Sequence, residues 1–148
     1  HYWNKMDYGN SEFTQILEPL YPQLRSFFVQ YQDAIKRRTP CHHDTVIENI
    51  FVRPEGIQLI DWEYATLGDP WFDIAVFCDS AKLNQQEQDE VVAHYSDLQG
   101  SHEKCREAFY RAQQGFYYLD LLWHCVQRYS IDILSAKLLR LNSHNGRI

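Results

Sequence analysis

The sequence predicts a mainly helical fold with one small β-hairpin near its middle. Two observations support this: apolar residues recur at helical spacing in several long segments, and two short apolar runs flank a single turn sequence. The length of 148 residues matches one average domain, and hydrophobic types make up 45% of it, enough to bury a core. We therefore expect residues 1–148 to form a single domain.

Two helices are expected before the hairpin. A short one covers residues 11–20 with Ser11 as its N-cap, and a longer one begins at Pro22, which suits the first turn of a helix. The second helix should end near Arg38, because Pro40 disfavours the helical conformation of the residue before it. Its single apolar face is made by Leu24, Phe27, Phe28, Tyr31 and Ile35.

The hairpin is expected from residues 50–53 and 57–60. The intervening Arg53-Pro54-Glu55-Gly56 has Pro second and Gly last, which is typical of a tight turn. Asp69 followed by Pro70 then predicts the start of a helix that runs to about Lys82. The remaining helices are expected at residues 85–98, 105–126 and 131–141.

Composition excludes several classes of function. Twenty acidic residues against fourteen basic ones give a formal net charge of −6, and the one basic run, residues 36–38, is too short to neutralise a nucleic-acid backbone. The longest apolar stretch, residues 74–78, is far too short to cross a bilayer. Four widely spaced cysteines are typical of reduced thiols in an intracellular protein. We expect a cytoplasmic protein with no nucleic-acid partner and no membrane span.

The residues suited to chemistry gather between positions 41 and 75. Asp44 and Asn49 lie at the two ends of a loop that enters the first strand, and Asp61 ends the partner strand. Because paired strands lie about 5 Å apart, Asn49 and Asp61 can reach the same end of the hairpin. An amide oxygen and a carboxylate suit Mg²⁺ that also binds phosphate oxygens, and Asp44 is free to face a nucleophile. This layout suits phosphoryl transfer.

The same residues resemble a known family. The run His42-x-Asp44-x4-Asn49, followed by a hairpin and Asp61-x-Glu63, is similar to the catalytic and metal-binding segments of the aminoglycoside phosphotransferase and choline kinase superfamily, whose members share the protein-kinase fold. The Cys-His-x-Asp opening and the Asp-Trp-Glu-Tyr-Ala run resemble its choline and ethanolamine kinase branch most. The resemblance implies that ATP is the co-substrate and Mg²⁺ the cofactor.

The resemblance also implies roles for single residues. Asp44 would be the catalytic base, Asn49 and Asp61 would bind Mg²⁺, and Asp73 would brace the catalytic loop. His42 is expected to hold that loop through packing and hydrogen bonds. A zinc site at residues 41–44 is disfavoured, because neighbouring residues cannot all face one ion and no second ligand pair follows at finger spacing. His43 is expected to be exposed.

The resemblance divides the chain into parts of a C-terminal kinase lobe. Residues 1–40 would be helices after the hinge, residues 41–64 the catalytic loop and metal-binding hairpin, and residues 69–148 the helical substrate-binding part. The sequence contains no glycine-rich loop and no strand with a Val-Ala-Ile-Lys-type lysine, so the N-terminal lobe that covers ATP is expected to be missing. The fragment alone should then be inactive.

Aromatic residues suggest what the substrate is. A quaternary ammonium group is bound by aromatic faces, often beside a carboxylate. Trp71, Tyr117 and Trp123 are candidates for such contacts, and Glu63 could face a cationic substrate.

Two classes of function remain open. The first is an ATP-dependent kinase of a small amino-alcohol. Choline or ethanolamine is the favoured substrate, and an aminoglycoside, thiamine or another metabolite is the alternative. An aminoglycoside would call for several carboxylates, and residues 105–129 offer only Glu107 and Asp120. The second class is a non-catalytic binding module or degenerate kinase lobe, against which the retained Asp44, Asn49 and Asp61 argue.

Overall fold

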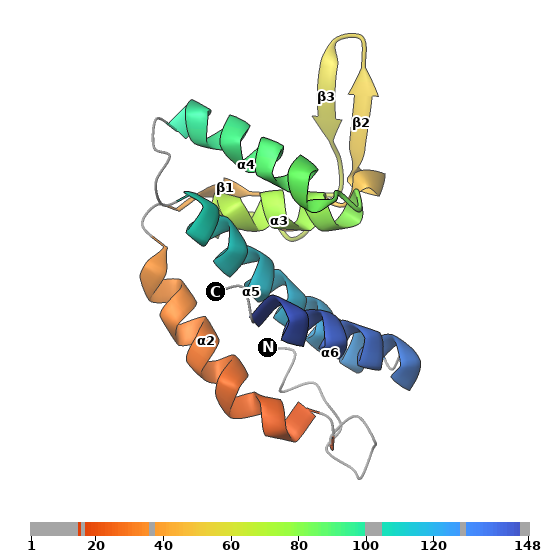
Figure 1. Cartoon of the computed structure of the whole chain (residues 1–148). Coiled ribbons are helices and arrows are strands. Elements are labelled where there is room, and N and C mark those ends of the chain that lie inside the picture. Colours follow the sequence, from red (N-terminus) through yellow and green to blue (C-terminus); the bar gives the residue numbers. More distant parts are fainter. Residues whose placement is uncertain (1–14, 16, 36–37, 100–104, 128–129, 146–148) are drawn as a thin grey trace. The chain divides into compact units, whose positions relative to one another are not determined.

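The computed structural model describes residues 15, 17–35, 38–99, 105–127 and 130–145. Its architecture is mainly helical with short antiparallel strands, as the sequence predicts (Figure 1). In these ranges no helix is both long enough and apolar enough to cross a membrane. In chain order the elements are η2 (Glu18–Leu20), α2 (Tyr21–Ala34), β1 (Thr39–Cys41), η3 (Ile47–Asn49), β2 (Ile50–Arg53), β3 (Gly56–Leu59), β4 (Thr66–Gly68), α3 (Pro70–Ser80), α4 (Gln85–Gln99), α5 (Cys105–Val126) and α6 (Ile131–Asn145).

The helices after the hairpin agree with the prediction, whereas the earlier ones differ. Half of the helix expected at residues 11–20, including its N-cap Ser11, lies outside the described residues, and its last three residues form the short 3-10 helix η2. The prediction that the next helix continues to Arg38 was wrong, because α2 ends at Ala34. The backbone must leave the helix early enough to be extended at Thr39, where it pairs with β4.

The predicted hairpin is confirmed, with β2 and β3 drawn in yellow in Figure 1. Arg53 pairs with Gly56 across the turn, and Gly56 has a φ of +133°, a conformation that side chains rarely adopt. Val52 pairs with Ile57 on one face of this ribbon, and both side chains are exposed. The ribbon is a two-stranded sheet, and with both of these side chains exposed it gains support only at the end where Ile50 pairs with Leu59.

A second pair of strands was not predicted. β1 and β4 are antiparallel, with Pro40 opposite Leu67 and Cys41 opposite Thr66. Strands of three residues are too short to show an alternating pattern, and Pro40 argues against a strand wherever its missing N–H would be needed. A two-stranded ribbon tolerates proline on its unpaired edge. This pairing ties the segment before the catalytic loop to the segment that follows the hairpin.

The chain divides into two compact units, residues 1–34 with 114–148 and residues 35–113. In the first unit, the ring of Phe27 on α2 lies 5.0 Å from that of the fully buried Tyr118 on α5. The core of this unit consists of Leu17, Leu24, Tyr117, Tyr118, Leu121, Leu122, Cys125, Leu134 and Leu141. The second unit contains all the strands, η3, α3, α4 and the first part of α5, and it holds every residue of the predicted catalytic loop and hairpin.

The four cysteines are free and buried. Burial raises the pKa of the Cys78 thiol in α3 to about 11, and that of the Cys125 thiol in α5 to about 11. Burial also raises the pKa of Cys41, whose Sγ donates a hydrogen bond to the Thr39 carbonyl. These thiols pack as small apolar side chains.

The predicted cap of α3 gives a local test of the fold. The Asp69 carboxylate accepts a hydrogen bond from the Trp71 amide at 3.1 Å. Asp69→Ala should remove this cap at a cost of about 1 kcal/mol, whereas Asp69→Asn keeps a side-chain acceptor and should cost little. Hydrogen exchange of the Trp71 amide should be faster in the alanine variant than in the asparagine variant. Equal exchange in the two variants would contradict this account.

Candidate active site

The predicted catalytic loop is bound to α3 by one carboxylate. Asp73, in the first turn of α3, accepts hydrogen bonds from two consecutive backbone amides, His42 N to Oδ2 and His43 N to Oδ1, each at 2.7 Å. The Thr45 hydroxyl adds a hydrogen bond to the Asp73 carbonyl. The start of the loop is therefore fixed to the helix at three points.

His42 links the loop to the hairpin. Its side chain is 1% exposed, its Nε2 lies 2.7 Å from the Ile60 carbonyl, and its Nδ1 lies 3.3 Å from the Asp44 amide. Because the carbonyl can only accept and the amide can only donate, Nε2 carries the proton and Nδ1 is the acceptor. The Trp62 ring, 4.6 Å away between centroids, covers the imidazole.

Asn49 holds the carboxylate of Asp44 in place. The Asn49 side-chain nitrogen donates to Asp44 Oδ2 and to the Asp44 carbonyl, both at 3.0 Å. Both amide protons are thus used, and the Asn49 side-chain oxygen makes no hydrogen bond within the described part of the chain. That oxygen is therefore available as a metal ligand.

Asp61 lies at the same end of the hairpin as Asn49. The Ile60 amide donates to the Asn49 carbonyl at 3.1 Å, which extends the strand pairing by one residue beyond β2 and β3. Asp61 follows directly and is exposed, with a φ of +62°. Asp is one of the few side chains that tolerate this left-handed conformation. The backbone turn ends the ribbon at the residue suited to bind a cation.

Acidic groups surround Asp44. Burial raises the pKa of the Asp44 carboxyl above its ordinary value, the hydrogen bond from Asn49 and the neighbouring His42 lower it, and the carboxylates of Asp61 and Glu63 raise it. Burial is the largest of these causes, so the folded state disfavours the charged form of Asp44. A bound cation would relieve the repulsion between Asp44 and its neighbouring carboxylates.

The donor set fits Mg²⁺ held together with phosphates. Among the described residues no three His, Cys, Asp or Glu side chains gather at a metal site, which excludes a closed protein cage there. Asn49 and Asp61 instead offer two hard oxygen ligands, and Mg²⁺ is commonly held by one or two such groups plus water and substrate phosphates.

The other predicted substrate residues have different surroundings. Glu63 is exposed beside Asp61. Trp71 on α3 packs edge-on against Tyr95 of α4, with 4.9 Å between ring centroids. Trp123 on α5 packs edge-on against the neighbouring His124, also at 4.9 Å. Glu63 and Trp71 belong to the unit that contains Asp44, whereas Trp123 belongs to the other unit.

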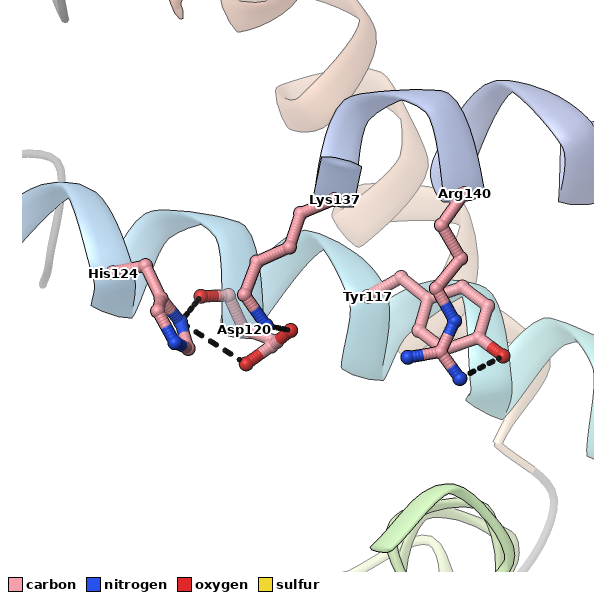
Figure 2. A network of polar contacts seen from close by, with 5 residues as sticks. All are labelled: Tyr117, Asp120, His124, Lys137 and Arg140. Carbon is pink, nitrogen blue, oxygen red and sulfur yellow. Dashed lines mark hydrogen bonds and ion pairs between the residues drawn. The ribbon is translucent and has the colours of Figure 1, made fainter. Parts of the chain in front are cut away.

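Tyr117 is part of a network between α5 and α6 that the sequence analysis missed (Figure 2). The Arg140 guanidinium lies 4.3 Å from the centroid of the Tyr117 ring and donates to its hydroxyl at 3.2 Å. One turn along, Asp120 accepts from Lys137 and lies 3.2 Å from His124 Nδ1. An aromatic ring and a carboxylate that could attract a substrate cation therefore already have cationic partners of their own.

Sequence reasoning also missed contacts within the catalytic loop. The bond from the Thr45 hydroxyl was not expected, and His43, expected at the surface, is partly buried. No periodic pattern marks either residue. The signal for His43 was its position between the two motif residues His42 and Asp44.

The chain is similar in sequence to known proteins. A family model described as the phosphotransferase enzyme family matches residues 4–110. The chain belongs to this family. Protein LicA of Haemophilus influenzae is 33% identical to the chain over 84 residues, which are 55% of this chain and 32% of LicA. A LicA homolog of Metamycoplasma hominis is 33% identical over 82 residues. The chain spans about a third of the length of the curated relatives it matches.

Solved structures show the same fold. The crystal structure of choline kinase LicA from Streptococcus pneumoniae matches with a TM-score of 0.74 and 23% identity, over 99% of this chain and 53% of that chain. A choline/ethanolamine kinase family protein from Mesorhizobium loti matches with a TM-score of 0.67 and 17% identity, over 96% and 50%. The predicted fold class is therefore confirmed: the chain has the fold of about half of a choline-kinase-like protein.

The raised pKa of Asp44 predicts a pH-dependent cost in stability. A carboxyl with a raised folded-state pKa contributes stability below its unfolded-state pKa, and this contribution is lost as pH rises through the folded-state pKa. Asp44→Asn removes the charge but keeps the shape. At neutral pH this variant should therefore have a larger free energy of unfolding than the wild type, and the difference should shrink on acidification. Urea denaturation at several pH values measures this difference in the free energy of unfolding. The control is Asp33→Asn, at an exposed position. An equal increase in the free energy of unfolding of the control would contradict the prediction.

The two hydrogen bonds that the Asp73 carboxylate accepts predict that a conservative substitution there lowers the stability of the fold. Asp73→Asn keeps one acceptor oxygen but places an amide group against the second backbone N–H. Hydrogen bonds to charged groups contribute about 1.5–3 kcal/mol each, and we expect a loss of this size in the free energy of unfolding. Urea denaturation of the two proteins provides the measurement. A loss below about 0.5 kcal/mol would show that water replaces the carboxylate without difficulty.

Proposed function

We propose that the protein to which this chain belongs transfers a phosphoryl group from ATP to the hydroxyl of a small amino-alcohol, choline or ethanolamine. The observation that carries the proposal is the hydrogen bonding of Asn49. Its side-chain nitrogen donates to the Asp44 carboxylate and to the Asp44 carbonyl, so its side-chain oxygen stays available, while its backbone carbonyl pairs with the Ile60 amide next to Asp61. Membership of the phosphotransferase family and similarity to LicA proteins support it.

Asp44 is the proposed base. Its Oδ2 accepts from Asn49, which leaves Oδ1 to receive the proton of the substrate hydroxyl and to direct that oxygen toward the γ-phosphate. A raised pKa makes a carboxylate a better proton acceptor, because the charged form is less favoured in its surroundings. Phosphoryl transfer depends mainly on the positioning of the reacting groups. The hydrogen bonds from the loop that carries Asp44 to Asp73 would provide this positioning.

Asn49 and Asp61 are the proposed magnesium ligands. Mg²⁺ bound there would neutralise the charge that develops on the phosphate oxygens. His42 and Asp73 would act by holding the loop, since Asp73 accepts from the amides of residues 42 and 43 and His42 Nδ1 accepts from the Asp44 amide. The half of the kinase fold that lies outside this chain would supply the cover over ATP.

Glu63 is the best placed residue for the substrate ammonium. It is exposed, and its charge is close enough to Asp44 to raise the pKa of that group. Trp62 beside it is 54% exposed and could offer an aromatic face. Tyr117 could contact the substrate only where Arg140 leaves its ring free, whereas Trp71 and Trp123 remain secondary candidates. We therefore rank Glu63 first.

ADP release by the natural gene product that contains this chain tests the proposal. Choline, ethanolamine, thiamine and kanamycin would be supplied in turn with Mg²⁺ and ATP. We expect release with choline or ethanolamine, and a fall in kcat of about 10²–10⁴ in Asp44→Asn, the range for loss of a general base. Release with kanamycin or thiamine alone would correct the substrate. Normal turnover by Asp44→Asn would overturn the role of Asp44, and absence of both ATP binding and turnover would favour a non-catalytic binding module.

A further inference from the structure

His43 has an unusual backbone conformation in the middle of the catalytic loop. Its φ is +64°, in the left-handed region that few side chains adopt. Its amide nevertheless donates to Asp73 Oδ1 at 2.7 Å, so the conformation is held by a charge-assisted bond. Strained residues of this kind persist only where surrounding contacts fix them, and they gather at functional sites.

The imidazole of His43 occupies a space that exists only because residue 68 is glycine. A Cβ placed on Gly68 would lie 2.2 Å from His43 Nε2 and 2.7 Å from Cε1, far inside van der Waals contact. Phe72 borders the ring edge-on, with centroids 5.6 Å apart. On the other side, Nδ1 lies 3.3 Å from the Tyr64 carbonyl, which can only accept, so Nδ1 carries the proton.

The two adjacent histidines bind the backbone on both sides of Asp61. His42 donates to the carbonyl of Ile60, one residue before Asp61, and His43 donates to that of Tyr64, three residues after it. The segment that carries Asp61 is thereby cross-linked twice to the loop that carries Asp44. The side chain of Asp61 makes no hydrogen bond of its own within the described residues, so its position depends on this backbone support.

We propose that His43 is a positioning residue, and that its contact with Gly68 and Tyr64 sets the place of Asp61 relative to Asp44. The inference rests on the proposed function, in which Asp61 binds Mg²⁺. His43 touches neither nucleotide nor substrate in this account, and it acts through the segment 61–68. Loss of its ring should therefore affect the use of Mg²⁺ more than the binding of the amine.

The test is a double-mutant cycle in the natural gene product. His43→Asn keeps a residue that tolerates the left-handed conformation but lacks the ring. We expect a kcat about tenfold lower and a several-fold higher Mg²⁺ concentration for half-maximal rate, with little change in the KM for the amine. Gly68→Ala should be worse, because the new Cβ displaces the ring. Adding His43→Asn to Gly68→Ala should relieve that clash, so that the double variant resembles His43→Asn.

A second readout separates this inference from the proposed function. The unfolding temperatures of the same four proteins should show the same non-additivity without any turnover. Addition of Mg²⁺ to the ATP-bound protein should raise the unfolding temperature, and this rise should be smaller in His43→Asn than in the wild type, even if no amine is phosphorylated. The exposed His94→Asn on α4 is the matched control and should behave as the wild type. Additive effects at positions 43 and 68, or an unchanged Mg²⁺ dependence in His43→Asn, would overturn the proposal.

Discussion

The carboxylate of Asp73 is the interaction on which the rest of the candidate site depends. Its two oxygens hold the amides of His42 and His43, and two consecutive amides can point at one carboxylate only if the backbone turns sharply there. The left-handed conformation of His43 supplies that turn. Because Asp73 lies in the first turn of α3, the same charge is also favoured by the unpaired amides of the helix. One side chain thus stabilises a helix start and determines the direction of the loop.

Much of the fold could be predicted because its elements are long or strongly marked. The stripe on α5 repeats over 22 residues, and Asp69-Pro70 marks the start of α3 by both cap and proline. The hairpin was recognisable from its turn. β1 and β4 were not, because three residues show no period and their pairing joins positions far apart in the sequence. Short non-local strands are specified by their partners rather than by their own residues.

In the candidate site, too, some residues could be predicted from the sequence and some contacts could not. Asp44, Asn49 and Asp61 could be singled out because the hairpin brings them together through local geometry. The contacts of His43 with Gly68 and of Tyr117 with Arg140 could not, since each depends on packing between segments far apart in sequence. An isolated glycine or arginine has many possible uses. Only the folded chain shows that this glycine leaves room for a ring and that this arginine covers one.

The buried cysteines give the two units separate reporters. At neutral pH a thiol with a pKa of about 11 is ionised in about one molecule in ten thousand, and only the thiolate reacts readily with alkylating reagents. Cys125 is the single cysteine of the first unit, whereas Cys41, Cys78 and Cys105 belong to the second. Reaction at Cys125 therefore requires the first unit to open, and reaction at Cys78 requires the second. The order in which the two thiols become alkylated in increasing urea would reveal which unit unfolds first.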